Sequence, residues 1–567
     1  MTATALGSPA IALPSLPELL RLRAAEQPER VAYTFLRDGE IPDLSFTYAE
    51  LDAAARSRAA ALAAAGLTGG TAVLLYPSGL EFVAALFGCM AARVAGAPVQ
   101  VPSRRRGLER LRRIADDAGA TTVLTTGAVK RDLEERFGDS PELSGLTLLP
   151  TDEVPHRDPD DSTPPSPDDV ALLQYTSGST GDPKGVRVTH ANFQANVAET
   201  DLLWPLAPDG TIVNWLPLFH DMGMLFGVIA PLWAGVPAVL MSPEAFIRRP
   251  ARWLEAISRF HGTHAAAPSF AYELCVRAVA ADPGTLDGLD LSHWRVAANG
   301  AEPVRWSTMD AFITTFAPAG FRAAAMCPGY GLAENTLKAT GSPGHRAPAV
   351  LRLDPEALRG GQARPGGTPV VGSGVPVGDT RIAIVDPERG DVRPDDTVGE
   401  IWISGPCVAD GYHGRPVESA ATFAARTADA GRTWLRTGDL GFLHDGELFV
   451  TGRLKDVIIR QGRNYYPQDI ELSAERADPG LRPNCAAAFS ADDGETERLV
   501  LVVEVDGRTL RIGADLLRDR IHASVHDGHR LTADEILLVR RGALPKTSSG
   551  KVQRRETRRR YLDGEFG

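Results

Sequence analysis

Residues 175–186 read YTSGSTGDPKGV, and this run decides how the rest of the chain is interpreted. It separates two apolar stretches, residues 170–175 and 186–189, that are typical of β-strands. Its glycines allow close backbone approach, so successive N–H groups can point into one concavity. The hydroxyl groups of the run add further donors, and Lys184 adds a positive charge. The run therefore predicts an anion-binding loop suited to a polyphosphate, with a plain surface turn as the alternative.

The loop differs from a Walker A phosphate-binding loop. A Walker A sequence reads GxxxxGK followed by Ser or Thr, and it opens a helix. Here Asp182 and Pro183 precede Lys184, and strand-like residues follow. The sequence therefore predicts a phosphate loop that connects two strands.

The composition indicates a globular protein with several structural units. The chain has 567 residues, of which 43% are hydrophobic, and this length is too great for one core. Its net charge of −12 argues against nucleic acid as a partner. Its five cysteines form no CxxC pair, so we expect reduced thiols, a cytoplasmic protein and no zinc site. The best apolar stretch, residues 82–92, stops at Arg93 and is too short to span a membrane, and we expect no signal peptide.

The order of the expected elements predicts an α/β fold. Residues 71–76 and 97–101 read as buried strands on either side of a helix at 82–93. This alternation predicts parallel, helix-covered sheets. Short strands expected at 381–385 and 400–404 indicate a smaller, more β-rich unit.

Several short motifs carry groups with a defined chemistry. WLPLFHDMG contains His220, which would gate a carboxylate pocket or would simply pack at the end of a strand. GYGLAENT contains Tyr330, whose ring offers a flat face to a purine, and Glu334, a carboxylate of the kind that Mg²⁺ prefers. Asp439 in RTGDLG can accept hydrogen bonds from two vicinal hydroxyls, as a ribose presents them. Lys551 in PKTSSGK is a cation on a glycine-containing loop, and taken alone it reads as a surface residue.

Taken together, these motifs resemble those of the adenylate-forming superfamily in their order and spacing. The motif sequences are most similar to those of the fatty acyl-AMP ligases, and the resemblance runs from about residue 20 to the end of the chain. It is carried by YTSGSTGDPKGV, WLPLFHDMG, NGAEPVR, GYGLAENT, RTGDLG, GRNYYPQDIE and PKTSSGK, together with FLRDGE (35–40) and PSFAYELC (268–275).

The resemblance implies an adenylate-forming enzyme fold with two domains. The expected N-terminal domain, residues 1–452, combines helix-covered sheets with a β-rich subdomain. A hinge at residues 453–457 would lead to a small, mobile α+β C-terminal domain, residues 458–567. Residues 344–369 leave room for the extra segment that fatty acyl-AMP ligases carry.

The resemblance also implies a ligase reaction. A fatty or related aliphatic carboxylic acid would attack the α-phosphorus of ATP, with Mg²⁺ present, and pyrophosphate would leave. The acyl adenylate would then pass its acyl group to the phosphopantetheine thiol of an acyl carrier protein.

The motif residues receive their roles from the same resemblance. Phosphate binding is implied for Thr176, Ser177, Gly178, Ser179, Thr180, Gly181 and Lys184. Adenine binding is implied for Asn299, Gly300, Ala301, Glu302, Pro303, Tyr330 and Gly331, and ribose binding for Asp439 and Arg453. Catalytic roles are implied for Lys551, His220 and Glu334, and Glu334 is also the expected metal ligand.

Three other interpretations stay open. An acyl-CoA synthetase shares the first half-reaction but uses free CoA, and the segment 344–369 argues against it. An amino-acid adenylation domain needs an acid near the substrate amine, for which Asp221 is a candidate. A non-catalytic protein of the same fold is disfavoured because Glu334, Asp439 and Lys551 are all present.

The end of the chain is basic, in contrast with the acidic whole. Arg554, Arg555 and residues 558–560 fall in a segment with a helical pattern. These arginines would either help to dock an acidic carrier protein or form a solvated helix face.

Overall fold

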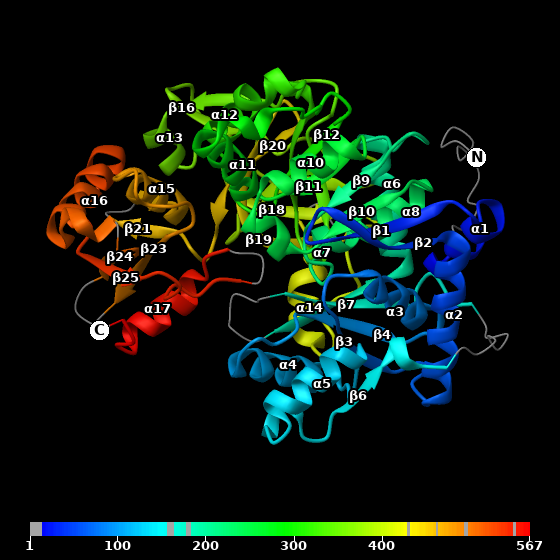
Figure 1. Cartoon of the computed structure of the whole chain (residues 1–567). Coiled ribbons are helices and arrows are strands. Elements are labelled where there is room, and N and C mark those ends of the chain that lie inside the picture. The colour runs from blue at the N-terminus through cyan, green and yellow to red at the C-terminus, as the bar shows by residue number, and fades with distance from the viewer. Residues whose placement is uncertain are drawn as a thin grey trace.

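Two large sheets, one above the other on the right of Figure 1, form the N-terminal part of the molecule. In the six-stranded sheet, with order β6-β5-β3-β4-β7-β8, all neighbouring strands are parallel except β7 and β8. Its strands are β3 (Thr71–Leu75), β4 (Ala95–Val99), β5 (Thr122–Thr125), β6 (Thr147–Pro150), β7 (Val170–Thr176) and β8 (Lys184–Thr189). This computed structural model describes residues 14–155, 164–176, 183–427, 431–460, 463–492, 497–507, 509–547 and 551–566.

The eight-stranded sheet has the order β14-β13-β12-β11-β9-β10-β1-β2. It is parallel in its middle and antiparallel at both edges, where β1 pairs with β2 and β13 with β14. Its strands are β1 (Val31–Arg37), β2 (Ile41–Thr47), β9 (Ile212–Asn214), β10 (Ala238–Met241), β11 (His264–Ala267), β12 (Val296–Asn299), β13 (Met326–Gly331) and β14 (Lys338–Gly341).

Helices cover these sheets, and α3 (Leu80–Ala91) lies between them. Every residue of α3 except Glu81 is buried, as expected for a helix that is apolar on almost all sides. One core cluster joins it to Leu74 of the six-stranded sheet and Leu36 of the eight-stranded sheet. The other helices of this part are α1 (Leu16–Glu26), α2 (Tyr48–Ala64), α4 (Arg105–Ala118), α5 (Gly127–Phe137), α6 (His190–Leu203), α7 (Asp221–Met224), α8 (Ala230–Ala234), α9 (Pro243–Arg248), α10 (Ala251–Arg259), α11 (Ser269–Ala281) and α12 (Trp306–Phe316).

A third, smaller sheet follows, with the order β17-β18-β19-β20. Its antiparallel strands are β17 (Arg381–Val385), β18 (Gly399–Ser404), β19 (Leu435–His444) and β20 (Glu447–Arg453), and α14 (Pro416–Phe423) packs against β19. The segment before it, in which we expect an insertion, forms a hairpin of β15 (Val350–Leu353) and β16 (Thr368–Val371) with α13 (Pro355–Arg359) between the strands.

Residues from 458 onward form a compact unit on the left of Figure 1, with a sheet and core clusters of its own. In the three-stranded sheet β24 pairs antiparallel with β23 and parallel with β25. The elements are β21 (Ile458–Arg460), β22 (Arg463–Tyr465), α15 (Pro467–Arg476), β23 (Ala486–Asp492), β24 (Glu497–Val505), α16 (Ala514–His529), β25 (Glu535–Arg540) and α17 (Arg554–Leu562).

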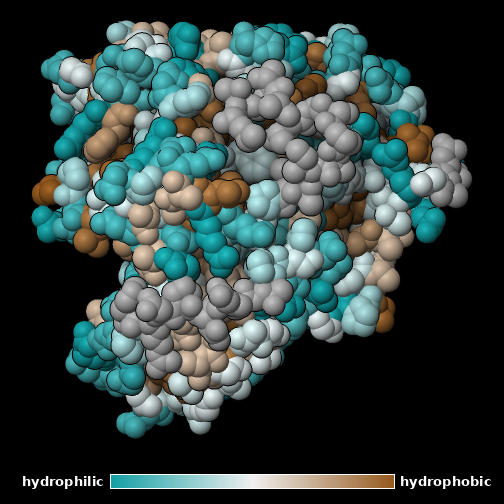
Figure 2. All heavy atoms as spheres, turned by 90° about the vertical axis from the view of Figure 1, so that its right-hand side faces the viewer, coloured by the Kyte–Doolittle hydropathy of each residue, from teal (hydrophilic) through white to brown (hydrophobic). Residues whose placement is uncertain are grey.

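The helix-covered, largely parallel sheets confirm the predicted fold class. Figure 2 shows a face that is mainly hydrophilic, with hydrophobic residues scattered among the others. Within the described ranges no helix has both the length and the apolar character needed to cross a membrane. All five cysteines are free and buried.

Candidate active site

A cleft of about 2220 Å³ lies between the N-terminal sheets, the small sheet and the C-terminal unit. The residues that sequence motifs single out line this one cleft, although they come from distant parts of the chain. They are Lys184, His220, Asn299, Gly300, Ala301, Glu302, Pro303, Tyr330, Gly331, Glu334, Asp439, Arg453 and Lys551. The structure places Thr176 as the last residue of β7. Ser177, Gly178, Ser179, Thr180 and Gly181 lie outside the described residues.

The strands on either side of the glycine-rich run form the predicted hairpin. β7 pairs antiparallel with β8, and Thr176 is opposite Lys184. The Lys184 ammonium lies 2.5 Å from a carboxylate oxygen of Glu418 and 5.2 Å from the centre of the Tyr412 ring. Lys184 holds the pKa of Glu418 below its usual value. A phosphate that bound here would therefore replace Glu418 as the ion-pair partner of Lys184.

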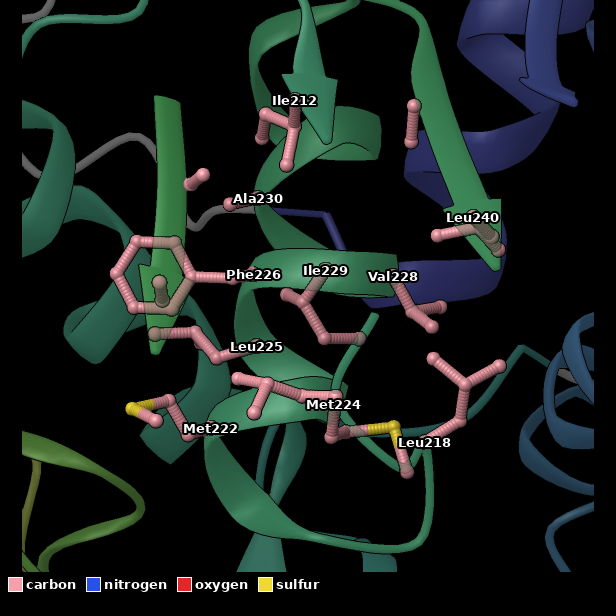
Figure 3. Close-up of a cluster of buried hydrophobic side chains, with 14 of the residues drawn as sticks. Ile212, Leu218, Met222, Met224, Leu225, Phe226, Val228, Ile229, Ala230 and Leu240 are labelled. Atoms are coloured by element: carbon pink, nitrogen blue, oxygen red, sulfur yellow. The ribbon is translucent and has the colours of Figure 1, made fainter. Parts of the chain in front are cut away.

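His220 and Asp221 form a pair at the start of a helical stretch. Their closest atoms, Nδ1 of His220 and Oδ1 of Asp221, are 2.6 Å apart. The stretch runs through α7, the π-helical turn η4 (Leu225–Ile229) and α8, and Figure 3 shows its apolar side chains among those of the neighbouring strands. Because this core anchors the helix, the pair is held at a fixed place in the cleft.

Two glycine-bearing turns meet beside the cleft. A side chain on Gly300 would lie 2.8 Å from the carbonyl oxygen of Gly329, and one on Gly331 only 1.9 Å from that of Leu337. Glycine at position 300 therefore lets the two turns lie this close together, and glycine at position 331 lets β13 lie close to the chain that returns as β14. Ala301, which follows Gly300, takes a left-handed φ of 67°.

The same region offers unusual polar groups. Asn299 is 1% exposed, and its Oδ1 accepts a hydrogen bond from Ser269, but its Nδ2 has no partner within the described part of the chain. Glu302 accepts a 2.6 Å hydrogen bond from the Phe270 amide, and burial raises the pKa of Glu302. An unpartnered buried N–H group costs free energy, so Asn299 is suited to donate to a ligand atom.

Asp439 lies at the centre of a second polar group. The hydroxyl of Tyr330 donates to one Asp439 oxygen at 2.8 Å, and Nε of Arg453 donates to the other at 3.0 Å. Asp439 and Arg453 are opposite each other on β19 and β20, so the sheet register brings them together. Burial, with the nearby Asp439, raises the pKa of Tyr330, which therefore stays a donor. Tyr330 thus orients the carboxylate through its hydroxyl, a role that the sequence alone did not indicate.

Glu334 lies in a short 3₁₀ turn, Ala333–Asn335. One of its oxygens accepts a 2.9 Å hydrogen bond from the hydroxyl of Tyr412. Burial raises the pKa of Glu334, which means that its negative charge lacks full compensation. A cation beside this carboxylate would supply that compensation.

Lys551 reaches the cleft from the C-terminal unit. Its backbone is fixed by Thr547, whose side-chain oxygen accepts the Lys551 amide at 3.0 Å. Burial lowers the pKa of Lys551, while Asp221, Glu302 and Asp439 act to raise it. Lys551 therefore lies within electrostatic range of these three acidic residues of the N-terminal part.

The charge of Lys551 in turn affects the pKa of Asp221. Burial alone would raise the pKa of Asp221, but His220 and Lys551 outweigh that effect and lower it. The nearby Lys546 behaves differently, because its ammonium pairs with the buried Glu504 at 3.0 Å. Of the two lysines, Lys551 is thus the one available to a substrate.

Sequence reasoning missed Tyr412 and Glu418, which contact Glu334 and Lys184. The only signal was an aromatic residue between two glycines at 411–414, which is too common to indicate a site. It also missed Asn484, whose side chain donates to Glu302 at 3.4 Å. A single asparagine in a loop carries no sequence signal of this contact.

Comparison with known proteins agrees with this geometry. Residues 20–413 match the family described as AMP-binding enzyme, and residues 455–567 match the AMP domain of Disco-interacting protein 2-like proteins. JamA of Moorena producens, a medium-chain-fatty-acid–acyl-carrier-protein ligase, is 42% identical over 97% of this chain and 95% of its own length. FadD26 of Mycobacterium bovis, a long-chain-fatty-acid–AMP ligase, is 36% identical over 97% and 98%.

Solved structures show the same relationship. A structure from work on fatty acyl-adenylate ligases of E. coli and L. pneumophila superposes with a TM-score of 0.88, at 32% identity and with 99% of each chain covered. The L. pneumophila ligase in complex with acyl adenylate and pyrophosphate gives a TM-score of 0.76 at 35% identity, covering 98% of this chain and 97% of that one. The chain therefore belongs to the AMP-binding enzyme family and, within it, to the fatty acyl-AMP ligases.

Proposed function

We propose that this ligase activates a fatty acid with ATP and transfers the acyl group to the phosphopantetheine thiol of an acyl carrier protein. The observation that carries the proposal is Lys551, which lines the same cleft as Asp221 and Asp439 and interacts electrostatically with both. The printed activity of JamA, a fatty-acid–acyl-carrier-protein ligase, supports the same acceptor. The five free cysteines support a cytoplasmic location for the enzyme.

In the first half-reaction the acid's carboxylate displaces pyrophosphate from the α-phosphorus of ATP. Negative charge grows on the phosphate oxygens during this step, and fixed cations stabilise it. Lys551 and Lys184, which both line the cleft, would supply those cations. His220, oriented by Asp221, is placed to hold the carboxylate as it approaches.

The cleft also contains groups that could bind the ribose and the adenine of ATP. Asp439 would accept from the ribose hydroxyls, with Arg453 and Tyr330 keeping the carboxylate in place. The turn at 299–303 would hold the adenine, and the free Nδ2 of Asn299 would donate to it. The glycine-rich run, including residues 177–182, would hold the outer phosphates.

We infer that Mg²⁺ accompanies ATP and binds Glu334. Within the described ranges, no group of three His, Cys, Asp or Glu side chains forms a metal site. A single carboxylate nevertheless fits Mg²⁺, which commonly takes one or two protein oxygens and completes its shell with phosphates and water. When bound, the ion would neutralise phosphate charge, and the buried carboxylate of Glu334 is suited to hold it.

For the second half-reaction we propose that residues 453–457 act as a hinge between an N-terminal domain, residues 1–452, and a C-terminal domain, residues 458–567. One cleft must serve two reactions, and a thiol needs access to the acyl adenylate that Lys551 now covers. A rotation about a short connecting segment would provide this access. At this point the Leu454 amide donates to the Gly438 carbonyl at 2.9 Å and the Asp456 amide donates to the Arg453 carbonyl at 3.1 Å. The Asp456 carboxylate also lies 3.6 Å from Arg554 of the C-terminal unit.

The segment 344–369 supports the choice of a carrier protein over free CoA. Leu353 packs against Phe442 and Phe449 of the small sheet. On its other side Glu356 accepts from Arg463 of the C-terminal unit at 2.7 Å. The segment thus contacts both sides of the proposed hinge, where it can limit closure on CoA.

The arginines of α17 give less support for carrier docking than the sequence suggested. Arg559 and Arg560 pair with Glu556, and Arg554 pairs with Glu471 at 2.6 Å. Their charge is largely matched by acids of the same unit. This arrangement favours the alternative of a solvated helix face.

An acyl-CoA ligase is the second candidate. It is favoured by FadD21 of Mycobacterium bovis, which is 36% identical over 97% of this chain and is described as a putative fatty-acid–CoA ligase. The two candidates differ only in the thiol that accepts the acyl group.

The test is to incubate the protein with ATP, Mg²⁺ and a panel of fatty acids and to identify the products by mass spectrometry. We expect acyl-AMP and pyrophosphate as products of the first step. When each thiol is then offered, we expect the carrier protein to become acylated and little acyl-CoA to form. Efficient acyl-CoA synthesis would favour the second candidate. An absence of acyl-AMP with every acid would contradict both.

A further inference from the structure

One part of the cleft is apolar and suited to an acyl chain. Met222 and Phe226 line it from the helical stretch that follows His220, and Figure 3 shows their side chains on the same side of that stretch. Trp204 and Leu337 contribute further apolar surface to the lining. A hydrocarbon chain attached to a carboxylate at His220 would be accommodated by these side chains.

Lys338, which follows Leu337 in the chain, also lines the cleft and is a buried basic residue. Lys338 is 4% exposed, and its ammonium has no hydrogen-bond partner among the residues that the structure describes. Its backbone is fixed, because the Asn196 side chain donates to the Lys338 carbonyl at 2.9 Å and accepts from its amide at 3.3 Å. Burying an ammonium without a hydrogen-bond acceptor lowers the stability of the folded protein, so a functional reason for Lys338 is to be sought.

The nearby Glu199 supplies a balancing charge but no free acceptor. Its oxygens already accept from the amides of Asp379 and Thr380, at 2.9 and 3.0 Å, and from the Thr380 hydroxyl at 2.6 Å. Glu199 opposes the lowering of the Lys338 pKa that burial causes. Lys338 therefore lacks a hydrogen-bond acceptor among the described residues, although Glu199 supplies one opposite charge that partly offsets the effect of burial.

We propose that Lys338 donates a hydrogen bond to an uncharged oxygen on the acyl chain, so that the enzyme selects hydroxy or oxo acids over plain acids. This inference rests on the proposed function, because it specifies the acid that the same cleft activates. An uncharged oxygen accepts a hydrogen bond from the Lys338 ammonium. It adds no further charge beside Lys338 and Glu199. A second carboxylate on the chain would add an unmatched negative charge beside Glu199, so a dicarboxylic acid is disfavoured.

The test compares medium-chain acids that are plain, that carry one hydroxyl or oxo group at successive positions, or that carry a terminal carboxylate. The measured quantity is kcat/KM for acid-dependent ATP–pyrophosphate exchange. The native protein should prefer at least one hydroxy or oxo acid over the plain acid by about tenfold or more. In Lys338→Met that preference should fall by about 10- to 100-fold, because the variant keeps the side-chain volume but loses the charged donor.

Two further variants keep the test sharp. Lys338→Met leaves Glu199 buried without its balancing charge, so the double variant Glu199→Gln/Lys338→Met provides a folded protein with both charges removed. It should show the same loss of preference. Lys130→Met is the matched control, because Lys130 lies on the surface 3.9 Å from Glu134, and it should behave as the native protein.

The outcomes separate the inference from the proposed function. If no acid supports exchange, the proposed function fails. If plain acids support exchange as well as oxygenated ones, and Lys338→Met changes no ratio, the inference is overturned while the proposed function stands. A preference for the dicarboxylic acid would also overturn it.

Discussion

At the scale of single residues, Lys551 is the group on which adenylation should depend most. It is the cation that the C-terminal unit brings to Asp221, Glu302 and Asp439. Lys551→Ala should lower the rate of adenylation by about 10²- to 10³-fold, because one cation that stabilises the transition state is lost. Binding of ATP should stay nearly intact, since other residues hold the nucleotide. Pyrophosphate release and ATP titration measure the two effects.

Lys546 provides the control for this experiment. It lies close in sequence, but its ammonium is engaged by Glu504. Lys546→Ala should be much milder in the rate of adenylation. A Lys551→Ala variant that releases pyrophosphate at the native rate would remove Lys551 from the mechanism.

The lowered pKa of Lys551 predicts a pH dependence. The ammonium form is the active one, and a rise in pH through the pKa removes its proton. Because burial lowers this pKa from the usual 10.5, adenylation should decline on the alkaline side earlier than an ordinary lysine would cause. Lys551→Arg, whose guanidinium keeps its proton, should shift that decline upward. Initial rates across the alkaline range test this, and identical declines in both proteins would contradict it.

At the scale of elements, the strongly patterned ones follow from the sequence. The helix expected at 82–93 is α3, and the strands expected at 381–385 and 400–404 are β17 and β18. The strand expected at 97–101 begins two residues earlier, as β4 (Ala95–Val99), because small residues there still fit a buried strand. Apolar periodicity thus locates elements well, whereas it locates their ends poorly.

The site shows a similar division. Motifs indicated the residues that line the cleft, but not the contacts between them. The pairing of Asn484 with Glu302 joins residues 182 positions apart, and Lys184 and Glu418 are likewise distant in the sequence. Both contacts depend on how the units pack. Such contacts leave no local pattern in one sequence.

The element 344–369 carries a prediction of its own. Deleting about residues 345–367 removes the hairpin that contacts Phe449 on one side and Arg463 on the other. Formation of acyl-CoA should then increase while adenylation continues, because closure onto CoA is no longer limited. Parallel assays of acyl-CoA and pyrophosphate measure this.

The control for the deletion is Arg463→Ala, which breaks only the exposed pair with Glu356. Exposed pairs contribute about 0–1 kcal/mol, so this change alone should have little effect. If the deletion variant folds but gains no acyl-CoA formation, the acceptor is chosen elsewhere in the molecule.

At the scale of the whole molecule, the proposed hinge should separate the two half-reactions. Proline at Lys455 restricts φ there and also limits the backbone of Leu454. Lys455→Pro should trap one arrangement of the two units and therefore affect adenylation and thiol transfer unequally. Separate single-turnover assays of each step measure this. An equal loss in both, with the protein still folded by circular dichroism, would argue against a hinge at this site.

The most direct test of the account follows the acyl group itself. The enzyme is loaded with its acyl adenylate, freed of excess ATP, and mixed with either holo-acyl carrier protein or CoA, and mass spectrometry then locates the acyl group. The account predicts that it passes to the phosphopantetheine thiol of the carrier protein and much more slowly to CoA. Rapid transfer to CoA, with no acylated carrier protein, would contradict it.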